Sequence, residues 1–169
     1  MTPKIETIVQ QLQKARKDTL ATAQKVTPEN RLRQLQAGKA TPLWLLGHLA
    51  NTLNSVVLIW TLQRESQIAR EVSKMFAPDF AGGKAPSANA DDYPPWEEVV
   101  ALYDRIMGLV IDGVSQMVDD QLPEPLAGKL PEPLRAFFSS NEVTLYQMIS
   151  HDAYHRGQLG LLGALAPAE

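Results

Sequence analysis

Four long segments of the chain repeat apolar residues at intervals of three and four, the spacing that gathers side chains on one face of an α-helix. The clearest stripe runs through the segment 94–117, where Val99, Tyr103, Ile106 and Val110 keep this interval. No segment shows a sustained alternation of apolar and polar residues, the pattern typical of strands. We therefore predict an all-α fold in which four helices bury their apolar faces as a four-helix bundle.

Start signals give approximate bounds for these helices. Thr2 and Thr41 are each followed by proline, a pair typical of an N-cap and the first helical turn. Thr144 is expected to cap the last helix, with Gln147 reaching back to it. The expected helices span residues 3–25, 42–63, 94–117 and 144–165.

The connection over residues 64–93 is long for a link between neighbouring helices. It is long enough to carry the chain across the bundle, so the helices need not follow a simple up-down-up-down order. With 169 residues, 44% of them hydrophobic, the chain has enough apolar surface for one core and too few residues for two. We expect a single domain over 1–169.

The composition excludes several function classes. There are 16 basic and 19 acidic residues, so no basic field favours a nucleic-acid partner. There is no cysteine, which excludes disulfides, thiolate ligands and a cysteine nucleophile. Any thiol chemistry must therefore use a sulfur from another molecule.

The most apolar stretch, residues 43–60, has about the length of a membrane span. It carries His48, Asn51, Thr52 and Asn54, which a packed helix of a soluble bundle accommodates better than a lipid bilayer does. The first residues, MTPKIETIVQQ, lack the basic and apolar regions of a secretory signal. We expect no membrane association and a cytoplasmic location.

Two of the three histidines of the chain, His151 and His155, are four residues apart in the last predicted helix. Residues at this spacing lie about 6 Å apart along the helix axis and about 40° apart around it, so the two imidazoles project side by side. The helical projection places His155 inside the apolar face and His151 at its edge. Such a pair is suited to hold one metal ion.

The third histidine, His48, lies on the flank of the second predicted helix, beside Trp44 and Thr52. If this helix neighbours the last one, three imidazoles converge and leave coordination positions open for water or substrate. Three protein ligands with an open position are typical of a catalytic metal site, whereas a structural site is normally closed by four.

The runs WLLGHLANT, residues 44–52, and HDAYHRGQL, residues 151–159, resemble those of the DinB-like superfamily, also called the YfiT-like metal-dependent enzymes. The resemblance covers nearly the whole chain. It implies a four-helix bundle of up-down-down-up type, often a homodimer, with a divalent metal held by His48, His151 and His155. Zinc and nickel are the metals commonly associated with such sites, with iron and manganese as alternatives.

Relatives of known activity in that superfamily include bacillithiol S-transferases and the mycothiol-dependent maleylpyruvate isomerase. The resemblance therefore makes a low-molecular-weight thiol a candidate cosubstrate. No residue of this chain identifies that branch.

Several neighbours of the histidines are candidate pocket residues. Asp152 and Arg156 either form an ion pair with each other or a neighbouring helix, or Asp152 orients an imidazole as a hydrogen-bond acceptor. Gln158 is placed to contact a ligand or a substrate, and Trp44 and Thr52 are expected to form pocket walls. Tyr154 is expected to point away from both histidines and to pack at an interface.

The residues thus favour a metal-dependent enzyme that acts on a small molecule, and the resemblance implies a transferase, with a hydrolase as the alternative. No catalytic acid or base stands out beside the metal. This leaves open a non-catalytic dimeric module that binds a metal or another ligand. A purely structural bundle, with the histidines bonded to backbone carbonyls, is the third alternative.

Overall fold

The computed structural model describes residues 1–128, 130 and 132–165, and no β-strand occurs among these residues. The α-helices are α1 Pro3–Ala23, α2 Pro42–Leu53, α3 Arg70–Phe76, α4 Trp96–Ser115, α5 Glu132–Arg135 and α6 Asn141–Gly163. Short 3-10 turns occupy Pro28–Asn30, Asp79–Ala81, Ala90–Asp92 and Asp119–Gln121. The prediction of an all-α fold is confirmed.

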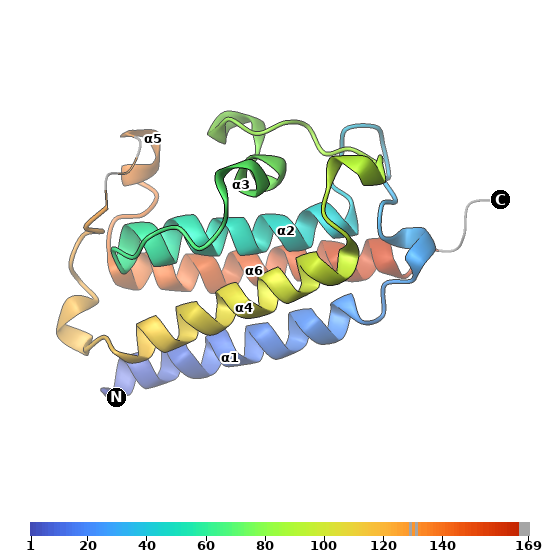
Figure 1. The fold of residues 1–169 in the computed structure, drawn as a ribbon. Helices are drawn as coiled ribbons and strands as arrows, with labels where there is room; N and C mark the ends of the chain where they lie inside the picture. Colours follow the sequence, from blue (N-terminus) through green and yellow to red (C-terminus); the bar gives the residue numbers. More distant parts are fainter. Residues whose placement is uncertain (129, 131, 166–169) are drawn as a thin grey trace.

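The four long helices α1, α2, α4 and α6 lie side by side (Figure 1). Both α1 and α2 pack against α4 and α6. Their apolar faces meet in one core cluster, in which full burial of each Leu or Ile side chain is worth about 1.5–3 kcal/mol. Core residues from the four helices include Ile5, Ile8 and Leu12; Leu45, Leu49 and Leu53; Val99, Ile106 and Val110; and Leu145, Met148 and Leu159.

The second predicted helix is present as α2 and a π-helical continuation, Asn54–Thr61. Thr41 caps it as predicted, because its side chain accepts a hydrogen bond from the Trp44 N–H at 3.1 Å. The stretch Pro42–Thr61 has the length and composition of a membrane span, but 78% of its most apolar window is buried inside the protein. Most of this stretch therefore packs in the core of the protein.

The capping of α1 differs from the prediction. The Thr2 side chain caps no N–H of the helix; it bonds instead to Asp119, from the turn that follows α4. The Asp119 carboxylate accepts hydrogen bonds from the backbone N–H groups of Lys4 and Ile5, at 3.2 and 3.0 Å. Asp119, which is distant in sequence, thus acts as the N-cap of α1. A local sequence pattern cannot predict such a cap.

The last helix begins earlier than predicted, at Asn141, and its cap is Ser140, whose side chain accepts from the Val143 N–H. Thr144 is one turn inside the helix and donates its hydroxyl to the Ser140 carbonyl oxygen. Gln147 does not reach back to Thr144; its amide donates to the Phe137 carbonyl oxygen. Both Ser140 and Thr144 are good capping types, so spacing alone did not separate them.

The long connection between α2 and α4 contains α3, which packs on the outside of α2 (Figure 1). The sequence pattern did not predict this helix, because seven residues are too few to show a period of 3.6. Because α3 packs over the middle of α2, it lies within hydrogen-bond distance of His48.

Candidate metal centre

The structure brings the three histidines together between α2 and α6. His48 is on α2, His151 and His155 are on α6, and one ligand nitrogen from each lies within 4.8 Å of the other two. The His48 ring centroid is 5.2 Å from that of His151 and 5.1 Å from that of His155. The expected convergence of the three imidazoles is therefore observed, and this cluster is able to hold a divalent metal.

His48 is buried, and its ring is fixed on two sides. Its Nδ1 lies 3.0 Å from the Phe76 carbonyl oxygen, which can only accept, so Nδ1 carries the proton and Nε2 keeps its lone pair. The Trp44 indole stacks on the imidazole with centroids 4.7 Å apart and planes 7° apart. Trp44 was predicted as a pocket wall, and it lies directly against the candidate ligand.

His151 and His155 are half-buried and face each other through their Nε2 atoms, which are 3.1 Å apart. His155 Nδ1 lies 2.7 Å from Gln158 Oε1, an acceptor, so this ring also carries its proton on Nδ1. Gln158, a predicted site residue, therefore orients His155. The lone pair of His155 Nε2 is left facing His151.

Burial lowers the pKa of all three imidazoles. The pKa of His48 falls to about 4, despite the hydrogen bond to Phe76, and that of His151 falls to about 3, helped by the neighbouring histidines. Desolvation also lowers the pKa of His155, and the bond to Gln158 partly offsets it. All three rings are neutral at pH 7, which is the form that coordinates metals.

The donor set fits a transition metal ion. Tetrahedral coordination at about 2.1 Å places ligand nitrogens about 3.4 Å apart, close to the His151–His155 separation. Neutral imidazoles suit zinc, nickel, copper and iron with little discrimination among them. The cluster contains no fourth protein ligand among the described residues, so it matches an open site rather than a closed structural one.

Asp152 points away from the imidazoles. Its carboxylate is fully buried and accepts hydrogen bonds from the Thr19 and Tyr103 hydroxyls, both at 2.7 Å, and from Arg156 at 3.4 Å. These bonds join α6 to α1 and α4. Of the two roles weighed for Asp152, the structure favours the ion-paired structural one, because both oxygens are already occupied.

Thr52 is half-buried on α2, one turn beyond His48, and its role as a pocket wall stays a prediction. The expectation that Tyr154 points away from the histidines is wrong: its ring centroid is 5.0 Å from that of His155, and its hydroxyl accepts from Gln158. Its side chain is long enough to bend over the adjacent residue, and it remains 64% exposed.

The support that α3 gives to His48 was not predicted from the sequence. The Phe76 and Met75 carbonyl oxygens accept from His48 and from the Trp44 indole N–H, and backbone acceptors leave no mark in a sequence. One signal was available. Glycine in the middle of a helix is about 1 kcal/mol less favourable than alanine, so Gly47 indicates that a neighbouring side chain needs the space. A Cβ there would lie 2.2 Å from the Phe76 ring.

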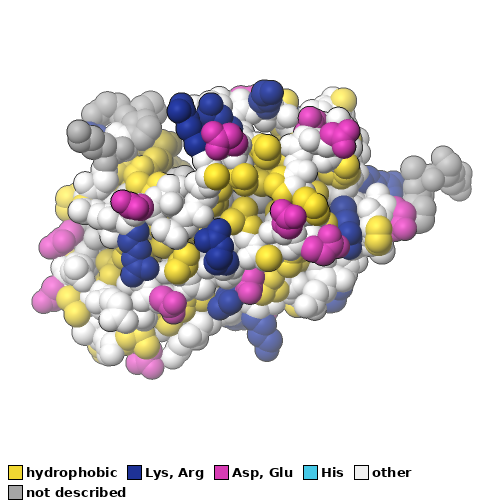
Figure 2. All heavy atoms as spheres, viewed as in Figure 1, with side chains coloured by type: hydrophobic (Ala, Val, Ile, Leu, Met, Phe, Trp, Pro, Cys, Tyr) yellow, Lys and Arg dark blue, Asp and Glu magenta, His cyan; other side chains and the backbone are white. Residues whose placement is uncertain are grey.

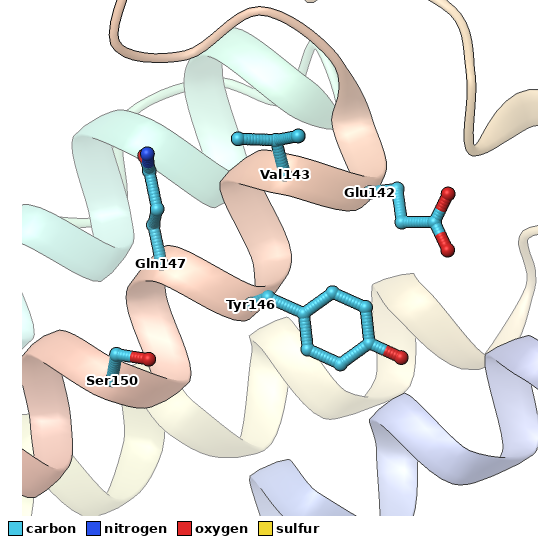
Figure 3. A pocket seen from close by; sticks show the side chains of 5 residues that line it. All are labelled: Glu142, Val143, Tyr146, Gln147 and Ser150. Atoms are coloured by element: carbon cyan, nitrogen blue, oxygen red, sulfur yellow. The ribbon is translucent and has the colours of Figure 1, made fainter.

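A separate hollow of about 440 Å³ lies on the outer surface of α6, lined by Glu142, Val143, Tyr146, Gln147 and Ser150. Figure 3 shows that all five side chains project from this one helix, with no second element closing the hollow. It ends one residue before His151 and includes none of the three histidines. It is an open surface, and the candidate centre lies elsewhere.

A comparison with protein families matches the model of the DinB superfamily to residues 11–159. The match contains α2, α3 and α4 and all three histidines. A comparison with curated proteins finds no match.

Proposed function

The chain belongs to the DinB superfamily, and from this premise we propose that it binds one divalent transition metal through His48, His151 and His155 and acts as a metal-dependent enzyme on a small molecule. The observation that carries the proposal is the meeting of three neutral imidazoles from two helices in a cluster to which the described residues add no fourth His, Cys, Asp or Glu. An open coordination position is what a substrate or water needs.

A bound divalent ion would supply Lewis-acid chemistry and lower the pKa of a coordinated water or thiol. The chain contributes orientation and burial. Phe76 and Gln158 hold the protons of His48 and His155 on Nδ1, so that both Nε2 lone pairs face the centre. Trp44 covers one face of His48 and keeps water from it.

For the reaction class we propose a transferase or a hydrolase. Because the chain has no cysteine, a thiol-dependent transfer would use a low-molecular-weight thiol as cosubstrate. Zinc and nickel are the first metals to test, followed by iron and manganese.

One observation favours the alternative, a non-catalytic dimeric module that binds a metal or another ligand. The carboxylate of Asp152, the residue after His151, is occupied by Thr19, Tyr103 and Arg156. The described part of the cluster therefore offers no acidic side chain as a general base. Turnover of any substrate that is lost on metal removal would exclude this alternative.

We further propose a single domain with up-down-down-up helix order, a homodimeric and cytoplasmic protein, and no nucleic-acid or membrane partner. The direction of the chain through α1, α2, α4 and α6 in Figure 1 supports the helix order. On the face drawn in Figure 2, acidic and basic side chains are interspersed, which supports the exclusion of a phosphate-backbone partner.

The test of the metal site is elemental analysis of untagged protein beside the His155→Ala variant. We expect about one equivalent of a transition metal in the wild type, as three ligands predict for a single ion, and loss of most of it in the variant. The Tyr146→Ala variant, changed on the outer face of α6, is the control and should keep its metal. A folded wild type that stays metal-free after exposure to zinc and to nickel would refute the proposal.

A further inference from the structure

The seven-residue helix α3 makes two adjacent backbone contacts to the candidate centre without supplying a ligand. The Met75 carbonyl oxygen accepts from the Trp44 indole N–H at 3.1 Å, and the Phe76 carbonyl oxygen lies 3.0 Å from His48 Nδ1. Carbonyls in the last turn of a helix lack intrahelical donors, so both are available for side chains of another element.

These two contacts hold a stacked pair. Trp44 and His48 are one turn apart on α2, and their rings are nearly parallel at 4.7 Å. Each ring has its N–H directed to one of two consecutive carbonyls of α3. The pair is therefore fixed both by stacking and by hydrogen bonds, which leaves the His48 ring little freedom to rotate away from His151 and His155.

The position of these carbonyls depends in turn on the Phe76 side chain, which is fully buried. Its ring lies in the space left by Gly47, where a Cβ would come within 2.2 Å, and it stacks on Tyr93 with centroids 5.6 Å apart. A side chain at position 47 cannot be accommodated unless Phe76 moves. Gly47, the residue before the candidate ligand His48, thus sets how closely α3 packs on α2.

We propose that α3, seated on Gly47 through Phe76, is the positioning element of the metal centre and determines the geometry and affinity with which His48 coordinates. This inference rests on the proposed metal site. Phe76 and Trp44 are positioning residues, since neither supplies a ligand atom.

The experiment compares Gly47→Ala and Trp44→Phe with the wild type and with the control Val114→Ala. Gly47→Ala displaces Phe76, whereas Trp44→Phe keeps a ring against His48 and removes the N–H that binds Met75. Val114 is fully buried near the end of α4. Its neighbour Gly113 faces Leu62, which follows the helical stretch that begins with α2, so Val114 lies away from His48. The control therefore reports a loss of core packing away from the centre.

Three readouts are needed for each protein: the zinc dissociation constant from chelator competition, the visible absorption spectrum of the Co²⁺ form, and the melting temperature without metal. We expect both site variants to bind zinc about 10-fold or more weakly, the usual cost of losing an outer-shell contact, and to show a changed Co²⁺ spectrum. The control should lose melting temperature while its zinc affinity and Co²⁺ spectrum stay as in the wild type.

The outcomes separate the two proposals. Wild-type protein that binds none of zinc, nickel and Co²⁺ would refute the metal site and the positioning role together. Wild-type binding with unchanged affinity and spectrum in Trp44→Phe and in any folded Gly47→Ala protein would overturn the positioning role alone. A control that weakens zinc binding as much as the site variants would also overturn it, because general destabilisation would then explain the effect.

Discussion

At the scale of single residues, the ligands could be predicted and their supports mostly could not. His151 and His155 stand out because a spacing of four places two imidazoles on one helical face, and His48 is the one histidine left to join them. Gln158 could be predicted only as a neighbour, since its bond to His155 depends on a side-chain rotamer. The Phe76 carbonyl could not be predicted at all, because every residue has one.

Gln158 carries a prediction at this scale. Gln158→Leu removes the acceptor that holds the His155 proton on Nδ1, so we expect zinc affinity to fall about 10-fold or more. Gln158→Glu keeps an acceptor at the same position and should retain most of the affinity. Chelator competition measures both.

The matched control for Gln158 is Leu161→Ala, an exposed change on the same helix. If Gln158→Leu binds zinc as tightly as Leu161→Ala does, the hydrogen bond to His155 has no part in coordination.

At the scale of helices, periodicity predicted the existence of the four long elements and local chemistry misplaced their ends. The stripe on α4 needs only the interval of three and four, which the sequence displays directly. The N-cap prediction was wrong at α1, where Asp119 binds the first turn from a distant turn. It was also wrong at α6, where Ser140 and Thr144 are both favoured capping types. The π-helical end of α2 and the short α3 carry no recognisable period.

The cap of α1 predicts a pH dependence. Desolvation alone would raise the pKa of the Asp119 carboxyl, but the hydrogen bonds from Thr2, Ile5 and Lys4 outweigh it and hold the pKa below its usual value of 3.8. A carboxyl with a lowered folded-state pKa contributes stability above its unfolded pKa, and this contribution is lost as the pH falls through the folded value. Asp119→Asn should therefore destabilise the protein at pH 7 and lose this effect in acid.

Urea unfolding of both proteins at a series of pH values measures this difference. The gap in unfolding free energy should be constant above about pH 5 and close as the pH falls below 3.8. A gap that persists unchanged in acid would show that the charge of Asp119 contributes nothing to the cap.

At the scale of the whole molecule, the sequence pattern did not determine which helices are neighbours. An apolar stripe shows which face of a helix is buried but not which helix covers it. The contact between α2 and α6 therefore had to be assumed when the convergence of the three histidines was predicted. The resemblance to the superfamily provided it, and the packing of α2 on α6 agrees with it. The buried bonds of Asp152 to α1 and α4 then fix the orientation of α6 around its two histidines.

Metal removal gives a prediction at this scale. His48 lies about a hundred residues before His151 and His155 in the chain, so an ion that binds all three joins two helices that unfolding separates. A ligand that binds only the folded state stabilises it by about 2.7 kcal/mol at a free concentration 100 times its dissociation constant. We expect zinc to raise the melting temperature and excess chelator to lower it.

The His155→Ala variant provides the control for that measurement, since its melting temperature should not respond to zinc or to chelator. An equal response in the variant and in the wild type would place the stabilising ion at some other site.

The stacking of Trp44 on His48 has an optical consequence. Of the three tryptophans, Trp44 alone stacks on a histidine, whereas Trp60 packs near Phe138 and Trp96 lies under Arg31. A paramagnetic ion held by His48 would therefore sit one ring away from an indole, close enough to quench its emission. The protein contains its own fluorescent reporter of occupancy, and a titration with Co²⁺ or Ni²⁺ can be followed without any label.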